Sequence, residues 1–192
     1  MMVTDIEKEV KLSVDFLKKG KIILYPTDTI WGIGCDATQS KPIDRIYRVK
    51  QRFESKSMII LLDHADKLSL YVKKVPPVAY DLIERYHEPL TIIYPDAMNV
   101  AKNVVAEDGT VAIRIVRDEF CRKMISLFNK PVVSTSANLS GQPAPIIFSK
   151  IPKEITSGVD HIVNYNRDVI IRTKPSTIIR LTDNGEFEVI RK

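Results

Sequence analysis

Short apolar stretches alternate with longer amphipathic ones along this chain, and this alternation limits the possible folds more than any other feature. Short runs rich in Val, Ile, Leu and Tyr that end at Pro, Gly or polar residues predict β-strands. These runs are residues 21–25, 58–62, 90–94, 110–116, 131–135, 161–165, 176–181 and 186–191. The sequence therefore predicts a sheet assembled from many short strands.

Amphipathic segments at helical spacing separate the early strands. Thr4-Asp5-Ile6-Glu7 has the pattern of a capping box and precedes a helix that runs toward Gly20. Further helices are expected near Ser40 and Pro42, over residues 65–72, from Pro76-Pro77 to Tyr86, and after a predicted N-cap at Asp118. Asp183-Asn184-Gly185 predicts a hairpin between the last two strands. The pattern favours one α/β domain over residues 1–192, with helices flanking a twisted sheet of parallel and antiparallel strands.

Composition excludes several classes of protein. No apolar run approaches the roughly 20 residues that cross a bilayer, and the N-terminus lacks the apolar core of a secretion signal. The two cysteines, Cys35 and Cys121, are far apart and the three histidines are scattered, so neither a disulfide framework nor a protein-bound transition metal is expected. This pattern is typical of a reduced, cytoplasmic protein with no membrane contact.

Glycine is scarce, and this restricts how the chain could bind phosphate. The chain has 7 Gly in 192 residues, and neither Gly-rich phosphate-binding motif occurs. Phosphate would therefore be held by cationic side chains, hydroxyl groups and helix N-termini.

Basic residues are concentrated in one segment. Residues 41–56 contain six bases and two acids, a charge of +4, whereas the whole chain carries +5. One compact patch suits a nucleotide or another phosphate better than a long nucleic acid. A solvated helix face is the alternative explanation.

Four polar stretches could carry chemistry, although each also has a purely structural explanation. Tyr25-Pro26-Thr27-Asp28-Thr29 ends a strand in hydroxyl groups before a predicted Gly-x-Gly turn at Gly32 and Gly34. In Lys50-Gln51-Arg52, an extended backbone would place both cations on one face to straddle a polyphosphate, whereas a helix would separate them. Ser134-Thr135-Ser136-Ala137-Asn138 and Lys174-Pro175-Ser176-Thr177 place hydroxyls and an amide at strand ends. They would face a ligand or form ordinary turns.

The order of these stretches along the chain carries more information than any one of them. Together with Pro89-Leu90-Thr91, Val111-Ala112-Ile113-Arg114 and Ile190-Arg191, they resemble the YrdC-like threonylcarbamoyl-adenylate synthase family, from about Gly20 to Arg191. The resemblance implies a single YrdC-like domain with a concave basic cavity and no additional C-terminal domain. It also implies the synthesis of threonylcarbamoyl-AMP and pyrophosphate from ATP, L-threonine and bicarbonate. Mg²⁺ is expected to bind through the phosphates.

The same resemblance implies roles for individual residues. Lys50 and Arg52 are expected to be catalytic through the phosphates. The expected nucleotide-binding residues are Lys50, Arg52, Lys56, Thr91, Ser134, Ser136, Asn138 and Arg191, and the expected threonine-binding residues are Thr29, Arg114 and Ser176. The implied partners are tRNA or double-stranded RNA and the downstream proteins of tRNA threonylcarbamoyladenosine modification.

Two other functions stay open at this point. Ala144 stands where many family members have a serine, and Lys174-Pro175 replaces family glycines, so a paralogue with another carbamoyl or nucleotide substrate is one alternative. A non-catalytic module that binds RNA or the ribosome is the other, and it predicts salt-dependent RNA binding without nucleotide turnover.

Overall fold

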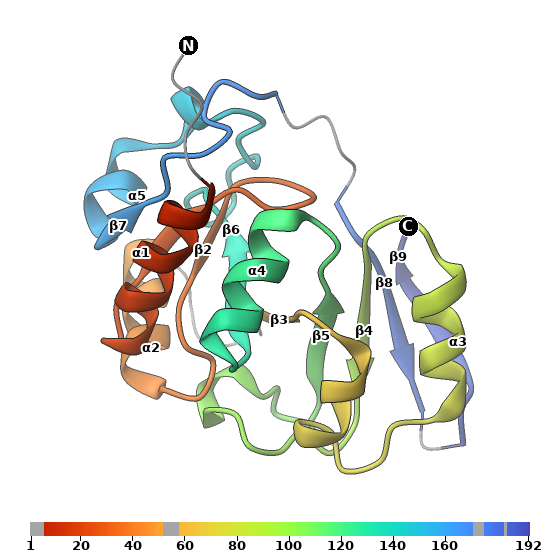
Figure 1. Ribbon diagram of the computed structural model, residues 1–192. Helices are drawn as coiled ribbons and strands as arrows, with labels where there is room; N and C mark the ends of the chain where they lie inside the picture. Colours follow the sequence, from red (N-terminus) through yellow and green to blue (C-terminus); the bar gives the residue numbers. More distant parts are fainter. Residues whose placement is uncertain (1–5, 52–57, 171–174, 183) are drawn as a thin grey trace.

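The computed structural model describes residues 6–51, 58–170, 175–182 and 184–192 as helices packed around one mixed sheet (Figure 1). The α-helices in this part of the chain are α1 (Ile6–Lys18), α2 (Ser40–Val49), α3 (Pro77–Arg85), α4 (Glu119–Phe128) and α5 (Lys153–Gly158). Short 3₁₀ helices are η1 (Ala65–Leu70), η2 (Lys102–Val104) and η3 (Phe148–Lys150). None of the helices in the described ranges is both long and apolar enough to cross a membrane.

The strands form a single sheet in the order β7-β1-β2-β6-β3-β5-β4-β8-β9. Their bounds are β1 (Ile23–Tyr25), β2 (Gly32–Gly34), β3 (Ile59–Leu62), β4 (Leu90–Tyr94), β5 (Val111–Ile115), β6 (Val132–Ser136), β7 (His161–Ile162), β8 (Thr177–Leu181) and β9 (Phe187–Arg191). β1 with β7, β3 with β5, and β4 with β8 are parallel pairs, and the other neighbours are antiparallel. The prediction of a mixed α/β sheet is confirmed.

The two faces of the sheet bury separate apolar cores. On one face, α1 and α4 lie side by side (Figure 1), and Val14 and Met124 pack with Leu61 and Val132 of the strands. On the other face, α2, α3 and α5 pack against alternate strand residues such as Ile33. Successive strand residues point to opposite faces, so each short strand supplies both cores.

Several local expectations are confirmed by the structure. The Asp118 carboxylate accepts a hydrogen bond of 2.8 Å from the Cys121 amide and caps α4. β8 and β9 are antiparallel, and Gly185 takes a positive φ of 85° in the turn between them. Such a turn favours glycine because a Cβ atom is strained at positive φ. The expected capping box at Thr4 lies outside the described residues, as does Asp183 of the predicted hairpin.

Other local expectations are wrong. Residues 32–34 are not a Gly-x-Gly turn but strand β2, which is hydrogen-bonded to both β1 and β6. A Cβ atom on Gly34 would overlap the Val133 carbonyl oxygen and lie 2.8 Å from Tyr25 Cε1, so glycine is what allows these strands to approach. The predicted strand over residues 161–165 is only His161–Ile162, and the helix predicted over residues 65–72 is the 3₁₀ helix Ala65–Leu70.

Candidate functional site

A cavity of about 370 Å³ is lined by residues of six strands, and three of these strands, β5, β6 and β9, contribute polar residues. Arg114 and Ser134, which line it, alternate along their strands with Ile113 and Val133 of the core beneath α2. The cavity is therefore on the same face of the sheet as α1 and α4. Its lining consists of Thr27, Thr29, Ile30, Gly32, Met58, Ile59, Arg114, Ser134, Thr135, Ser136, Ala144, Pro175, Ser176, Ile178 and Arg191.

Strand register brings distant residues of the site into one row. Arg114 of β5 is paired with Thr91 of β4, Thr91 with Ile178 of β8, and Ile178 with Arg191 of β9. The two arginines therefore stand at the ends of a four-strand row, and both line the cavity. Burial and the nearby Arg114 guanidinium lower the pKa of Arg191 below its ordinary value. The shift is expected where two like charges lie near each other. An anion bound between the two arginines would relieve their repulsion.

Arg114 is held by the turn that follows β1. Its guanidinium lies 3.2 Å from the Asp28 carboxylate and donates a hydrogen bond of 3.3 Å to the Thr29 hydroxyl. The Thr27 hydroxyl shapes this turn by accepting from the backbone amides of Thr29 and Ile30, at 3.1 and 3.2 Å. Among the described residues, the buried Nε of Arg114 has no hydrogen-bond partner. A buried donor without a partner is costly, so this nitrogen is an unsatisfied polar group beside the cavity.

Asp118, a second acidic residue that interacts with Asp28 and Arg114, is also affected by burial. Burial raises the pKa of Asp118 above its ordinary value, although the hydrogen bond from Cys121 opposes the shift and the Asp28 carboxylate adds to it. The site thus contains one arginine beside two carboxyl groups, so Arg114 is electrically compensated.

Arg191 and Thr91 both hold Ser176. Arg191 donates from Nε and Nη2 to the Ser176 carbonyl oxygen, at 3.2 and 2.9 Å. The Thr91 and Ser176 hydroxyls are 2.9 Å apart, and both residues are almost completely buried. Thr91 does not line the cavity, so the structure places it behind Ser176.

Lys50 lies behind the opposite wall of the cavity. It caps the C-terminus of α2 with helical backbone angles (φ −81°, ψ −5°), so of the two backbones considered for Lys50-Gln51-Arg52 the extended one is not found at this residue. Its side chain is 2% exposed and donates to the Asn138 carbonyl oxygen at 2.7 Å. Asn138 in turn donates to the carbonyl oxygens of Leu139 and Gln142. Neither Lys50 nor Asn138 lines the cavity.

The site residues predicted from sequence are therefore distributed over the cavity and its surroundings. Six of them line it: Thr29, Arg114, Ser134, Ser136, Ser176 and Arg191. Thr91, Lys50 and Asn138 support its walls. Arg52, Lys56 and Lys174 lie outside the described residues, so their roles stay predictions. Ala144 and Pro175, both departures from the family pattern, line the cavity.

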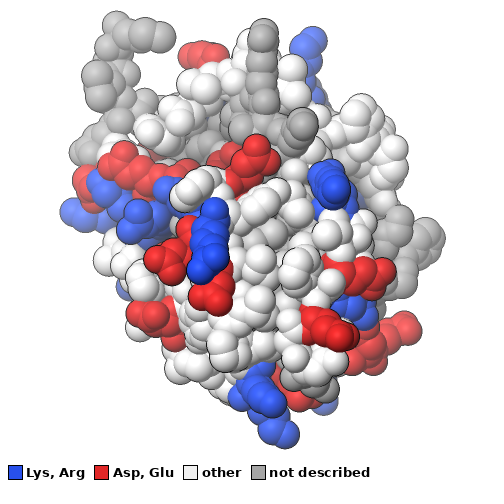
Figure 2. All heavy atoms as spheres, turned by 90° about the vertical axis from the view of Figure 1, so that its right-hand side faces the viewer, with Lys and Arg blue, Asp and Glu red and all other residues white. Residues whose placement is uncertain are grey.

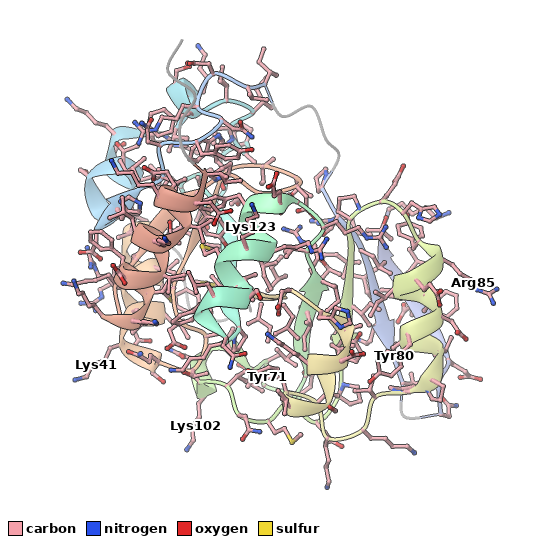
Figure 3. All side chains as sticks on the ribbon, viewed as in Figure 1. Lys41, Tyr71, Tyr80, Arg85, Lys102 and Lys123 are labelled. Carbon is pink, nitrogen blue, oxygen red and sulfur yellow. The ribbon has the colours of Figure 1, made fainter. Side chains whose placement is uncertain are left out.

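The basic segment does not supply the cations that the structure shows at the cavity. Within residues 41–51, Arg45 forms an ion pair of 2.5 Å with Asp160, and Lys41 on α2 points into solvent (Figure 3). Among the described residues, the cations lining the cavity are Arg114 and Arg191, which come from β5 and β9. Figure 2 shows that on the side of the molecule carrying α3, basic and acidic residues are interspersed.

Sequence reasoning missed three contributors to the site. Asp28 pairs with Arg114, and Thr27 shapes the turn, although both were visible within Pro26-Thr27-Asp28-Thr29. Gly32 lines the cavity, and a Cβ atom there would lie 3.0 Å from the Ser134 hydroxyl oxygen. The alternation of one acid between two threonines was the available signal for Asp28, but its partner is 86 residues away.

A larger cavity of about 860 Å³ lies between α1 and α4 and contains none of the predicted site residues. Its lining is charged, and Lys123 at its edge pairs with Glu7 and Glu119 (Figure 3). These ion pairs are exposed, so they contribute little to stability.

Comparison with known proteins agrees with this geometry. Residues 15–192 match the Sua5/YciO/YrdC family, which is described as "Telomere recombination". The threonylcarbamoyl-AMP synthase of Pseudoalteromonas translucida is 30% identical over 175 residues, which cover 90% of this chain and 92% of that protein. The threonylcarbamoyl-AMP synthase of Vibrio cholerae is 32% identical over 154 residues, covering 79% of this chain and 82% of that protein.

A solved structure shows the same fold. The crystal structure of Pyrococcus abyssi Sua5 complexed with L-threonine superposes with a TM-score of 0.84 at 27% identity. The superposition covers 93% of this chain and 52% of that one, so this chain spans about half the length of the P. abyssi protein. On the family match over residues 15–192, the shared fold and these relatives, the chain belongs to the Sua5/YciO/YrdC family.

Proposed function

We propose that this protein is a threonylcarbamoyl-AMP synthase, which makes threonylcarbamoyl-AMP and pyrophosphate from L-threonine, bicarbonate and ATP. One observation carries the proposal: a single cavity joins the residues expected for nucleotide binding, Ser134 and Ser136, to those expected for threonine binding, Thr29, Arg114 and Ser176. Direct attack of a threonine-derived carbamate on ATP requires both substrates in one cavity. The names of the relatives and the threonine complex of P. abyssi Sua5 support the same assignment.

The cavity offers groups suited to each part of the substrates. Arg114 and Arg191 attract carboxylate or phosphate oxygens, and the serine and threonine hydroxyls donate or accept hydrogen bonds. Its volume lies within the range of roughly 300–1,000 Å³ that is usual for small-molecule sites. Arg114 is compensated by Asp28, so the amino-acid end of the cavity is suited to a zwitterion such as threonine.

The proposed reaction proceeds without a protein nucleophile. The threonine amine adds to carbon dioxide from bicarbonate and loses a proton, which gives a carbamate. A carbamate oxygen then bonds to the α-phosphorus of ATP while the bond from that phosphorus to the pyrophosphate oxygen breaks. Such a transfer depends on positioning and on neutralising charge. Arg191, together with Arg52 and Lys56 as the sequence predicts, is proposed to neutralise the phosphates.

Mg²⁺ is proposed to arrive with ATP. Across the residues that the structure describes, no group of three or more His, Cys, Asp and Glu side chains could hold a metal ion. Mg²⁺ commonly binds through substrate phosphates and water, with few protein ligands. The donor set of the cavity, hydroxyls and arginines, fits a metal carried by the triphosphate.

The cell context is part of the same proposal. The product would pass to proteins that modify tRNA, and contact with tRNA or double-stranded RNA is expected on the protein surface. Both cysteines are buried and unpaired, as is usual in the cytoplasm.

The decisive experiment incubates the protein with ATP, Mg²⁺, bicarbonate and L-threonine. Pyrophosphate release that requires threonine, together with the mass of the threonylcarbamoyl adduct, is the expected result. Release that does not depend on threonine contradicts the proposal. L-Serine and L-alanine in place of threonine serve as matched controls, because serine lacks the γ-methyl group and alanine lacks both the γ-methyl group and the hydroxyl.

A further inference from the structure

The Lys50 ammonium is bonded to the loop that ends β6. It donates to the backbone carbonyl oxygens of Ser136 and Asn138, the latter at 2.7 Å, and lies 3.4 Å from Asn138 Oδ1. The backbone bonds in the other direction as well, because the Ser140 amide donates to the Lys50 carbonyl oxygen at 3.0 Å. Both ends of Lys50 therefore fasten the C-terminus of α2 to residues 136–140.

The Lys50 ammonium directs its N–H donors at oxygen atoms of this loop. An ammonium has three N–H donors, and three loop oxygens surround this one. The side chain is 2% exposed, and a buried charge is tolerated only where hydrogen bonds replace its water. Carbonyl oxygens fill that role here.

The fastened loop forms one wall of the cavity. Ser134, Thr135 and Ser136 line it, and the chain turns away immediately after them. On the other side of the loop, the Ala137 amide donates to the Trp31 carbonyl oxygen at 2.9 Å. Lys50 and Trp31 thus both hold the segment whose residues Ser134 and Ser136 line the cavity.

We propose that Lys50 is a positioning residue, which acts through the backbone of Ser136 and Asn138 and not by contact with the phosphates of ATP. This inference rests on the proposed function, because it assigns the nucleotide to the wall that Lys50 fixes. It changes the expectation drawn from Lys50-Gln51-Arg52, in which both cations grip phosphate. Of Lys50 and Arg52, only Arg52 is then expected to bind phosphate.

The test compares three ligands by titration calorimetry: AMP, inorganic pyrophosphate and L-threonine. The variants are Lys50→Met and Lys50→Gln, the second serving if the first does not fold, with Lys41→Met on the exposed side of α2 as the matched control. We expect AMP binding to weaken by about tenfold or more, since a displaced wall loses several hydrogen bonds. L-Threonine binding, at the other end of the cavity, is expected to change by less than about twofold, within the usual scatter for distant sites.

Two results would overturn the inference. A weaker affinity for pyrophosphate with unchanged AMP binding would place Lys50 on the phosphates. An equal loss of threonine binding would show that the whole cavity, not one wall, depends on Lys50. Failure of the wild-type protein to bind AMP and threonine, or to turn over, would instead count against the proposed function.

Two further measurements separate positioning from charge. Lys50→Arg keeps the charge, but the planar guanidinium cannot direct three donors at these oxygens, so it is expected not to restore AMP binding. Restored binding would favour a simple charge effect and contradict the proposal. Amide exchange of Ala137 and Ser140 is expected to quicken in Lys50→Met while α4 amides stay protected, a readout that needs no ligand. Unchanged exchange at both amides would contradict the proposal.

Discussion

Asp28 and Arg114 form an ion pair of 3.2 Å in which the carboxylate side chain is 12% exposed and the guanidinium side chain 4%. The pair joins the turn after β1 to strand β5 and sets one end of the cavity. Because Asp28 compensates Arg114, the two ends of the arginine row differ: Arg191 is bonded to the neutral oxygens of Ser176. The cavity therefore offers one neutralised and one less compensated cation.

Removing the charge of Asp28 is expected to destabilise the protein. Asp28→Asn removes the ion-pair partner of the buried Arg114, which costs about 3 kcal/mol of unfolding free energy. Urea denaturation measures this change. The double variant Asp28→Leu with Arg114→Met is expected to be less destabilised than the sum of its single changes, since it removes both charges. Additive costs in that cycle would contradict the role of the pair.

The hydroxyl of Thr91 is expected to matter for binding more than for folding. Thr91→Val removes the partner of the Ser176 hydroxyl and costs about 1 kcal/mol of stability. L-Threonine affinity, measured by calorimetry, is expected to fall several-fold because Ser176 loses its orientation. Thr177→Val is the matched control, since its hydroxyl bonds Tyr86 at 2.9 Å outside this cavity. Equal effects of both variants on threonine binding would rule out a specific role.

Loss of Arg191 is expected to weaken ATP binding. Arg191→Ala removes a cation from the cavity, and the affinity for ATP should fall by about tenfold, the usual scale for a charge-assisted contact. Arg180→Ala on the neighbouring strand changes the net charge equally but removes only an exposed pair with Asp108. If the two variants bind ATP equally well, Arg191 does not contact the nucleotide.

Gly34 is required by close packing of strands. Gly34→Ala would force a Cβ atom against the Val133 carbonyl oxygen and the Tyr25 ring, and we expect a loss of about 3 kcal/mol or more. Gly109→Ala is the control. A Cβ atom there meets nothing within 4 Å, and the residue has a φ of +80°, so this variant carries backbone strain without a clash. Backbone strain alone costs about 1 kcal/mol. Equal destabilisation by the two changes would argue against the clash.

His161 is expected to make stability depend on pH. Burial, opposed by the Glu9 carboxylate at 3.5 Å, lowers the pKa of His161. The unfolded chain, where histidine has a pKa of about 6.5, therefore binds the proton better, and stability falls as the pH drops below that value. Urea unfolding at several pH values between 5 and 8 measures the slope. We expect His161→Asn to flatten it and the exposed control His87→Asn to leave it unchanged; a slope that persists in His161→Asn would contradict this assignment.

Local chemistry determined what could be predicted from sequence. The N-cap Asp118, the hairpin at Gly185 and strands such as Leu90–Tyr94 depend on neighbours a few residues away, and the structure contains them. The segment at Gly32–Gly34 was predicted wrongly because its extended form depends on β1 and β6 on either side, not on its own propensity.

The sequence by itself determined the classes of element and the chemistry available for a site: hydroxyls, arginines and few glycines. Only the tertiary structure decided which of these meet. Strand β4 pairs with both β5 and β8, and β8 pairs with β9, so Arg114, Thr91 and Arg191 fall into one row. The tertiary structure also decided that the Lys50 ammonium donates to the loop after β6. The physical reason is that strand order and register follow from burying apolar faces supplied by distant segments, which no local pattern encodes.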